Sequence, residues 1–157
     1  MNGTEIRIVS AEPKQLAEVL DLISRFYREE GFATNRDQME EPVERLLRGE
    51  GGAILLALSG SFPAGVAALA TAVGIEQGGL GAELTDLYVH PDFRSHGIAR
   101  KLIEQTIEWC RQHGVNALSA VITPEAQAAN NLIGFYTRFG LRNTGRLIMA
   151  MKIPESH

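Results

Sequence analysis

Hydrophobic and polar side chains alternate along this chain with two periods, one typical of strands and one typical of helices. Near the N-terminus, Ile6 and Ile8 alternate with Glu5 and Arg7, which predicts a strand with one buried face. Apolar residues at intervals of three and four then predict a helix that ends before Gly31. Over the whole chain the two periods predict strands at about 4–10, 53–58, 65–76, 83–89, 116–123 and 147–153, and helices at about 13–30, 35–48, 97–113 and 124–139.

The order of these elements indicates an α/β fold of the α+β type, built on one mixed sheet. Antiparallel hairpins come first and a strand–helix–strand crossover follows, so we expect a mostly antiparallel sheet of about six to seven strands with about four helices on its two faces. The stretch 51–75 carries no charged side chain, but Ser59-Gly60-Ser61 and Pro63 interrupt it. Such turn residues favour two buried strands over a membrane-spanning helix. At 157 residues, the chain is expected to form a single domain over 1–157.

Composition disfavours several kinds of partner and cofactor. A net charge of −4 argues against broad contact with nucleic-acid phosphates. The one cysteine, Cys110, lies in the apolar stripe of the 97–113 helix, which favours a core thiol in a reducing compartment over a nucleophile. The histidines have no companions at metal-ligand spacing, and no secretory signal opens the chain. We therefore expect a cytoplasmic protein that uses no metal, nucleic acid or membrane.

The segment from Leu87 to Arg100 is the most informative part of the chain for chemistry. A buried strand ends, a loop turns sharply, and a long helix begins at Gly97. Such a helix start offers free backbone N–H groups to an anion, and Arg94 adds a guanidinium suited to phosphate oxygens. These residues predict an anion or diphosphate site, although a surface loop with an incidental arginine would show the same spacing. Neither G-x-x-x-x-G-K-[ST] nor G-x-G-x-x-G is present.

The run from Arg94 to Ala99 resembles the [RQ]-x-x-G-x-[GA] motif of the GNAT superfamily of acetyl-CoA-dependent N-acetyltransferases. The preceding Leu-Tyr-Val-His-Pro-Asp-Phe is similar to the strand that leads into that motif. Downstream, the run Phe135–Leu141 resembles the family's L-Y-x-K-x-G-F segment. The order of elements also agrees with the family from Ile6 to Ile153, so the resemblance covers essentially the whole chain.

The resemblance implies a coenzyme site and a proton donor. The strand through Leu87, Tyr88 and Val89 would diverge from the next strand and pair its backbone with the pantetheine amides. The pyrophosphate would lie against Arg94, Ser95, His96, Gly97, Ile98 and Ala99. Arg138 would lie near the 3′-phosphate, Tyr136 would protonate the departing thiolate, and Asn130 would take the family's helper role.

Two positions depart from the family pattern. Ser95 and His96 replace a common Gly and a common Lys or Arg, which removes one cation but keeps the backbone donors. The family's helper asparagine usually stands seven residues before the tyrosine, where this chain has Ala129. Asn130 therefore takes that assignment from the next position.

Two carboxylates on the 83–89 strand are candidates for the general base, Glu83 and Asp86. Regular alternation puts Glu83 on one face with Thr85, Leu87 and Val89, and Asp86 on the other face with Tyr88, although a bulge would change these faces. The resemblance matches Glu83 to the base of histone-type relatives and Asp86 to an acid of aminoglycoside- and polyamine-acetylating relatives. An apolar strand would raise the pKa of either carboxyl toward that of a useful base. Either acid could instead pair with an arginine or face water.

The first fifty residues carry the chain's net charge, with 11 acidic and 7 basic side chains against 8 of each in the rest. In the family this region walls the acceptor site, so an acidic rim would attract a cationic amine. The leading hypothesis is direct acetyl transfer from acetyl-CoA to an amine in a ternary complex. The alternatives are a non-catalytic acyl-CoA sensor and a protein N-terminal or lysine acetyltransferase. The apolar strand at 147–153 makes a homodimer possible.

Overall fold

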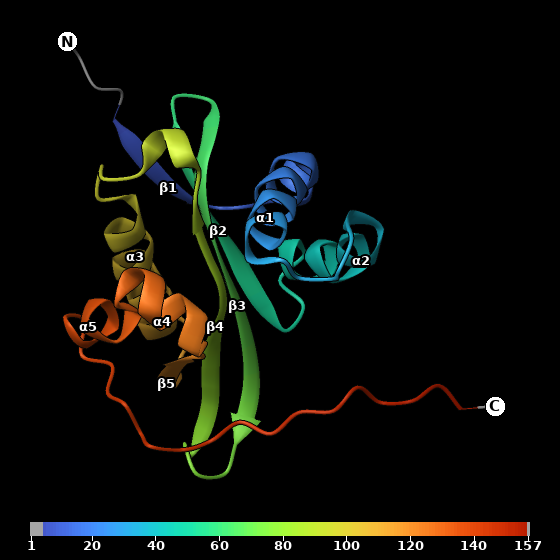
Figure 1. Cartoon of the computed structure of the whole chain (residues 1–157), viewed down its shortest axis with the longest axis vertical. Helices are drawn as coiled ribbons and strands as arrows, with labels where there is room; N and C mark the ends of the chain where they lie inside the picture. The colour runs from blue at the N-terminus through green and yellow to red at the C-terminus, as the bar shows by residue number, and fades with distance from the viewer. Residues whose placement is uncertain (1–4, 157) are drawn as a thin grey trace. The chain divides into compact units, whose positions relative to one another are not determined.

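The computed structural model describes residues 5–156 and has ten main elements (Figure 1). They are β1 (Ile6–Ser10), α1 (Leu16–Glu30), α2 (Arg36–Leu47), β2 (Gly52–Ser59), β3 (Phe62–Gly74), β4 (Gly79–Val89), α3 (Ile98–Gln112), β5 (Val115–Ala120), α4 (Pro124–Asn130) and α5 (Leu132–Thr137). Short 3₁₀ turns precede α1 at Pro13–Gln15 and α3 at Pro91–Phe93. Contacts gather the chain into two units, one ending at Val121 and one starting at Ile122, and each is described by itself.

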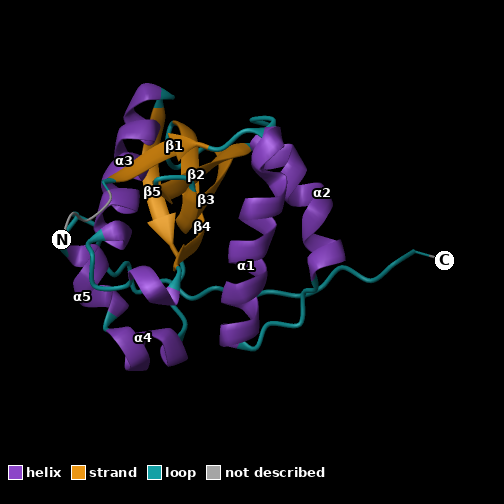
Figure 2. Cartoon of the chain, turned by 90° about the horizontal axis from the view of Figure 1, so that it is seen from above, coloured by secondary structure: helices purple, strands orange, loops and turns teal. Residues whose placement is uncertain are grey.

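The first unit holds one mixed sheet with strand order β1-β2-β3-β4-β5. The first four strands are antiparallel neighbours, and β5 runs parallel to β4. A parallel neighbour needs a crossover connection, which α3 supplies. Helices α1 and α2 cover one face of the sheet and α3 covers the other (Figure 2). The mixed, mostly antiparallel sheet with helices on both faces is confirmed.

The helices begin and end where local chemistry requires. Asn35 caps α2, since its side chain accepts from the backbone N–H of Gln38 while the Gln38 side chain accepts from the N–H of Asn35. Gly31 ends α1 at a φ of 73°, a conformation that glycine adopts without strain. The apolar face of α1, including Val19 and Ile23, packs on β2 and β3 in one core cluster.

The sheet has five strands, not six to seven, because residues 147–153 form no strand. A strand exists only where a neighbouring backbone completes its ladder, and the described part of the second unit contains no other strand. The segment runs extended with its apolar side chains in water, and Leu147 and Met149 are more than 90% exposed. Apolar alternation alone therefore did not predict this end of the chain correctly.

The expected single helix at 124–139 is divided into α4 and α5 by Asn131. This residue adopts a left-handed conformation, with a φ of 46°, and its side chain accepts from the N–H of Gly134 to cap α5. Asparagine tolerates this conformation better than most residues. The preceding strand also ends early, at Ala120, because Thr123 serves as the cap of α4.

The uncharged stretch 51–75 forms the β2–β3 hairpin, with Gly60 in its turn at a φ of 62°. This confirms the two-strand interpretation of the stretch. Among residues 5–156, no helix has both the length and the apolar character that crossing a bilayer requires.

Candidate functional site

A β-bulge at Thr85 divides β4 into two halves. Ala68 of β3 lies opposite Asp86 and the next residue, Leu69, lies opposite Leu84, so Thr85 is the extra residue. An extra residue inverts the alternation of side chains beyond it. Glu83 and Asp86 therefore lie on the same face, with Tyr88, and the expectation that regular alternation separates them is wrong. This is the face that α1 and α2 cover.

The half of β4 that follows Thr85, residues 86–89, has one unpaired edge. β5 pairs with β4 only from Leu80 through Leu84, and no described strand continues the pairing beyond that point. On its other edge, β4 stays paired with β3 as far as Val89. The expected divergence of the strand through Leu87, Tyr88 and Val89 is present, and its main-chain groups on this edge are available to a ligand.

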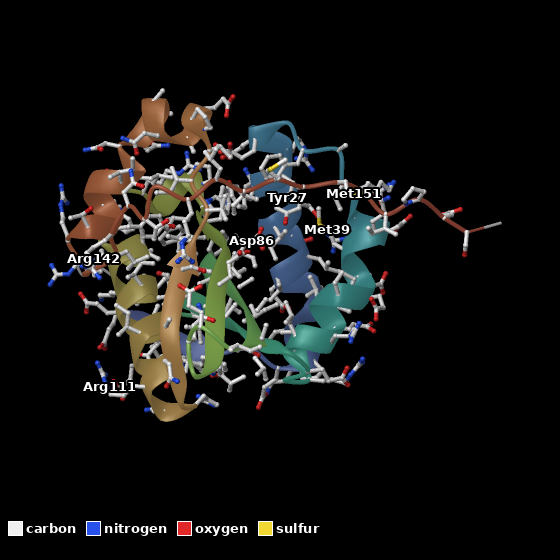
Figure 3. All side chains as sticks on the ribbon, turned by 90° about the horizontal axis from the view of Figure 1, so that it is seen from below. Tyr27, Met39, Asp86, Arg111, Arg142 and Met151 are labelled. Atoms are coloured by element: carbon white, nitrogen blue, oxygen red, sulfur yellow. The ribbon has the colours of Figure 1, made fainter. Side chains whose placement is uncertain are left out.

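Asp86 is held by two hydroxyl groups. The Tyr27 hydroxyl on α1 donates to Oδ1 at 2.7 Å. The one proton of the Thr85 hydroxyl is shared between Oδ2 at 2.9 Å and the Ala68 carbonyl oxygen at 3.2 Å. Figure 3 shows Tyr27 beside Asp86, where α1 meets β4. Burial, and then the Asp86 carboxylate, raise the pKa of Tyr27, so Tyr27 remains a protonated donor. Both oxygens of Asp86 thus accept hydrogen bonds within the protein.

Glu83 differs from Asp86 in having no such partners. It lies opposite Ala70 on β3 and Ser119 on β5, in the half of β4 that is paired on both sides. Within residues 5–156, the Glu83 side chain has no hydrogen bond or ion pair. The oxygens of its half-buried carboxylate are therefore open to a ligand.

The loop between β4 and α3 ends in an exposed group of backbone donors. Ser95 and Gly97 both have positive φ, at 68° and 74°, which turns the chain into the first turn of α3. No side chain caps α3, so the backbone N–H groups of its first turn have no capping partner from a side chain and remain available as donors. A Cβ built on Gly97 would meet no atom within 4 Å, so the backbone at this residue is not covered by a neighbouring group.

His96 is fixed by the same loop. Its Nδ1 lies 2.8 Å from the carbonyl oxygen of Arg94 and 3.1 Å from that of Phe93. A carbonyl oxygen only accepts hydrogen bonds, so Nδ1 must carry the proton and Nε2 is left outside these contacts. The imidazole therefore stabilises the loop through its own carbonyl groups.

The Arg94 side chain extends from the loop between β4 and α3 toward α1. Its Nη2 donates to Glu29 at 2.9 Å, its Nε donates to the Val89 carbonyl at 3.1 Å, and its guanidinium lies 5.5 Å from the centre of the Tyr88 ring. The Tyr88 hydroxyl donates to the other Glu29 oxygen at 2.7 Å. Arg94 thus connects the loop between β4 and α3 to the C-terminal end of α1.

Titration of this cluster follows from its contacts. Partial burial raises the pKa of Glu29, but hydrogen bonds from Tyr88 and Arg94 and the charges of Arg94 and Arg25 outweigh it, so the net pKa is below its ordinary value. Burial first, and then the hydrogen bond to Glu29, raise the pKa of Tyr88 to about 12. Tyr27 and Glu29 were missed by the sequence reasoning, because their partners on β4 lie 59 residues away and no local spacing signals them.

The second unit carries the remaining expected site residues. Tyr136 is a buried residue of α5 whose ring packs edge-on against Phe135. Burial raises the pKa of Tyr136 to about 12, so its hydroxyl keeps its proton near neutral pH. Asn130 is exposed at the end of α4, and Arg138 is exposed just after α5.

Cys110 is buried on the inner face of α3, as its place in the apolar stripe predicted, and burial raises the pKa of its thiol. It is therefore a core residue. In the described part of the chain, no group of three or more histidine, cysteine or acidic side chains is arranged so that it could hold a metal ion.

Comparison with known proteins gives one family and many structural neighbours. The family model described as the acetyltransferase (GNAT) family matches residues 16–141. No curated protein matches the sequence.

Three solved structures illustrate the likeness. An integron cassette protein from the mobile metagenome of Cole Harbour Salt Marsh is 25% identical, with a TM-score of 0.81 over 95% of this chain and 91% of that chain. The aminoglycoside N-acetyltransferase AAC(6')-Iy, solved in complex with CoA, is 19% identical, with a TM-score of 0.80 over 96% and 97%. A possible acetyltransferase from Clostridium difficile 630 is 16% identical, with a TM-score of 0.82 over 96% and 99%.

Proposed function

The chain belongs to the acetyltransferase (GNAT) family, and from this premise we propose that it transfers an acetyl group from acetyl-CoA to an amine. One observation carries the proposal. The unpaired edge of β4 and the uncapped N-terminus of α3 are joined by one short loop. The first offers main-chain groups to the amides of a pantetheine arm, and the second offers amides to a diphosphate. A neighbour of similar fold, AAC(6')-Iy, was solved with CoA.

The grip on the diphosphate would rest mainly on backbone donors. Two of the three side-chain nitrogens of Arg94 are already engaged by Glu29 and Val89. Gly97 leaves the approach to the α3 amides open. We therefore assign pyrophosphate binding to the backbone from Ser95 to Ala99, with Arg94 adding charge from the side.

The general base is best assigned to Glu83. A base must present an open oxygen to the ammonium, whereas the Asp86 oxygens already accept hydrogen bonds from Tyr27 and Thr85. Glu83 lies on the same face and lacks such donors among the described residues. Asp86 then serves as a fixed negative charge that attracts and orients the substrate ammonium.

The proposed step balances as follows. Glu83 takes one proton from the ammonium, and the neutral amine nitrogen attacks the thioester carbonyl carbon to form the C–N bond. The C–S bond then breaks, the nitrogen loses its second proton to solvent as the amide forms, and Glu83 returns its proton to solvent. Tyr136, kept protonated by burial, gives its proton to the leaving thiolate. The Tyr136 phenolate is then reprotonated from solvent.

Coenzyme binding is tested by thermal unfolding. Acetyl-CoA at about 100 times its Kd should add about 2.7 kcal/mol of stability, which raises Tm by about 5–11 °C in a domain of this size. Gly97→Asp should abolish the rise, because a carboxylate would face the diphosphate. Gly114→Asp is the matched control, since Gly114 also has a positive φ, at 67°, and open space, but stands after the far end of α3.

Turnover is then measured as release of CoA thiol across a panel of amines. A rise in Tm with amine-dependent thiol release supports the acetyltransferase. A rise with no release for any amine indicates a sensor of acyl-CoA, and no rise in folded protein contradicts coenzyme binding itself.

A further inference from the structure

A groove of about 410 Å³ lies on the sheet below the Thr85 bulge. Every residue that lines it belongs to β3, β4, β5 or the turn between β3 and β4. Glu83 is one of these residues and lies at the end of the groove nearest to the bulge. The groove therefore begins at the carboxylate that the mechanism assigns as base.

The floor of the groove is built from two rows of side chains that cross three strands. Ala70, Glu83 and Ser119 lie opposite one another in one row, and Ala72, Gly81 and Ala117 lie opposite one another in the next. Apart from Glu83, these residues have the smallest side chains available. The hollow exists because this part of the sheet carries little side-chain volume on that face.

Gln77 closes the far end of the groove. A Cβ built on Gly74 would lie 1.8 Å from the Gln77 Oε1, so the Gln77 side chain lies directly over Gly74. The backbone carbonyl of Gln77 accepts from the Asn116 side chain at 2.9 Å, which fixes the turn to β5. The groove thus has a carboxylate at one end, a neutral amide at the other, and an uncharged floor between them.

We propose that this groove holds the body of the acceptor and selects an amine with a single ammonium group and an uncharged body. The proposal rests on the acetyl-transfer function stated above. Glu83 is the one charged residue among those that line the groove. An ammonium beside Glu83 is compensated, whereas a second ammonium further along would be desolvated against alanine and glycine without a carboxylate. Ligand sites of about 300–1,000 Å³ suit small molecules.

Gly81 offers a direct test of the floor. A Cβ at Gly81 would contact the Gln77 Cγ at 3.5 Å, an ordinary van der Waals distance, so a side chain is accommodated there and projects into the groove. Gly81→Val should raise KM for tryptamine at least about tenfold, since a change of one or two methyl groups in a pocket is worth about 10–200-fold. The kcat for tryptamine and the KM for acetyl-CoA should change less than twofold.

Two further variants make the result interpretable. Ser59→Val adds the same side chain at the end of β2, outside the groove, and should leave every constant unchanged. Ala72→Val adds volume to the same row of the groove, because Ala72 lies opposite Gly81. This variant is used in place of Gly81→Val if the Tm of Gly81→Val shows that it does not fold.

Selectivity is measured with tryptamine, which carries one ammonium, against spermidine, which carries several. We expect kcat/KM for tryptamine to exceed that for spermidine at least about tenfold, the ratio that 1.4 kcal/mol of discrimination gives. Preference for spermidine, or equal effects of Gly81→Val and Ser59→Val, overturns this inference while leaving acetyl transfer intact. Absence of transfer to every amine overturns the proposed function, and the inference with it.

Discussion

The two halves of β4 on either side of Thr85 carry one acidic residue each on the same face, yet the two carboxylates have different surroundings. Above the bulge, Asp86 accepts hydrogen bonds from Tyr27 and Thr85, and the strand has an open edge. Below it, Glu83 has no partner among the described residues, and the strand is paired on both sides. A single inserted residue thus creates two environments that a regular strand would not.

The difference indicates how one strand can divide two tasks. A carboxylate held by hydroxyl donors has a fixed position, which suits the orientation of a cation. A carboxylate without such donors has oxygens open to a substrate N–H group, which suits a base. Since the bulge brings both to one face, they can act on the same substrate nitrogen.

The strongest test of this comparison exchanges each acid for its amide. Glu83→Gln should lower kcat/KM by about 10²–10⁴-fold, the usual contribution of a general base, and should remove the acidic limb of its pH profile. Asp86→Asn should keep that limb and act mainly by raising the KM for the amine. Steady-state kinetics between pH 5 and pH 9 measure both effects, and CoA binding serves as the control that each variant is folded. Loss of the limb in Asp86→Asn instead would reverse the two roles.

The sequence predicted the elements of the first unit well because each depends on local signals. The cap at Asn35, the stop at Gly31 and the turn at Gly60 all act within a few residues. The bulge at Thr85 has no such signal, since Glu83–Val89 reads as an unbroken strand. Its register is decided by the pairing of β3 with β4.

The candidate site was predictable only in part, for the same reason. The loop at Gly97 and the open edge of β4 follow from motif and order of elements. Tyr27 and Glu29 join the site through contacts that span 59 residues, which depend on how α1 packs on the sheet. The 147–153 segment failed as a strand because alternation describes one strand and not the neighbour it needs.

A smaller effect, on stability, distinguishes the Tyr27–Asp86 hydrogen bond from the Tyr88–Glu29 hydrogen bond. Tyr27→Phe removes one of the two hydroxyl groups that donate to Asp86 and leaves only Thr85. The change should therefore cost about 1–2 kcal/mol of unfolding free energy and lower Tm by about 2–8 °C. Tyr88→Phe should cost less, because Glu29 keeps its ion pair with Arg94. Calorimetry at neutral pH compares the two. A larger loss in Tyr88→Phe would show that the Glu29 cluster, and not Asp86, is the more dependent on its hydroxyl donor.

The smallest expected effect is the pH dependence of the Glu29 contact above the bulge. The pKa of Glu29 is lowered in the folded state, so its stabilisation is complete above the ordinary carboxyl pKa and is lost as pH falls through the lowered value. The contribution stays below about 1 kcal/mol because both Glu29 and Arg94 are well exposed to water. The difference in Tm between the wild-type protein and Glu29→Gln should therefore shrink from pH 7 to pH 3. A difference that grows toward acid pH would contradict the sign.

The unpaired edge of β4 has a consequence for which substitutions the strand can accept. Main-chain amides and carbonyls are offered by every residue type except proline, so the recognition they provide survives nearly any substitution along Asp86–Val89. If the proposed function holds, exposed side chains there can change with the acceptor while the main-chain contacts to the cosubstrate are kept. Only a proline, or an insertion that closes the gap with another strand, would end that tolerance.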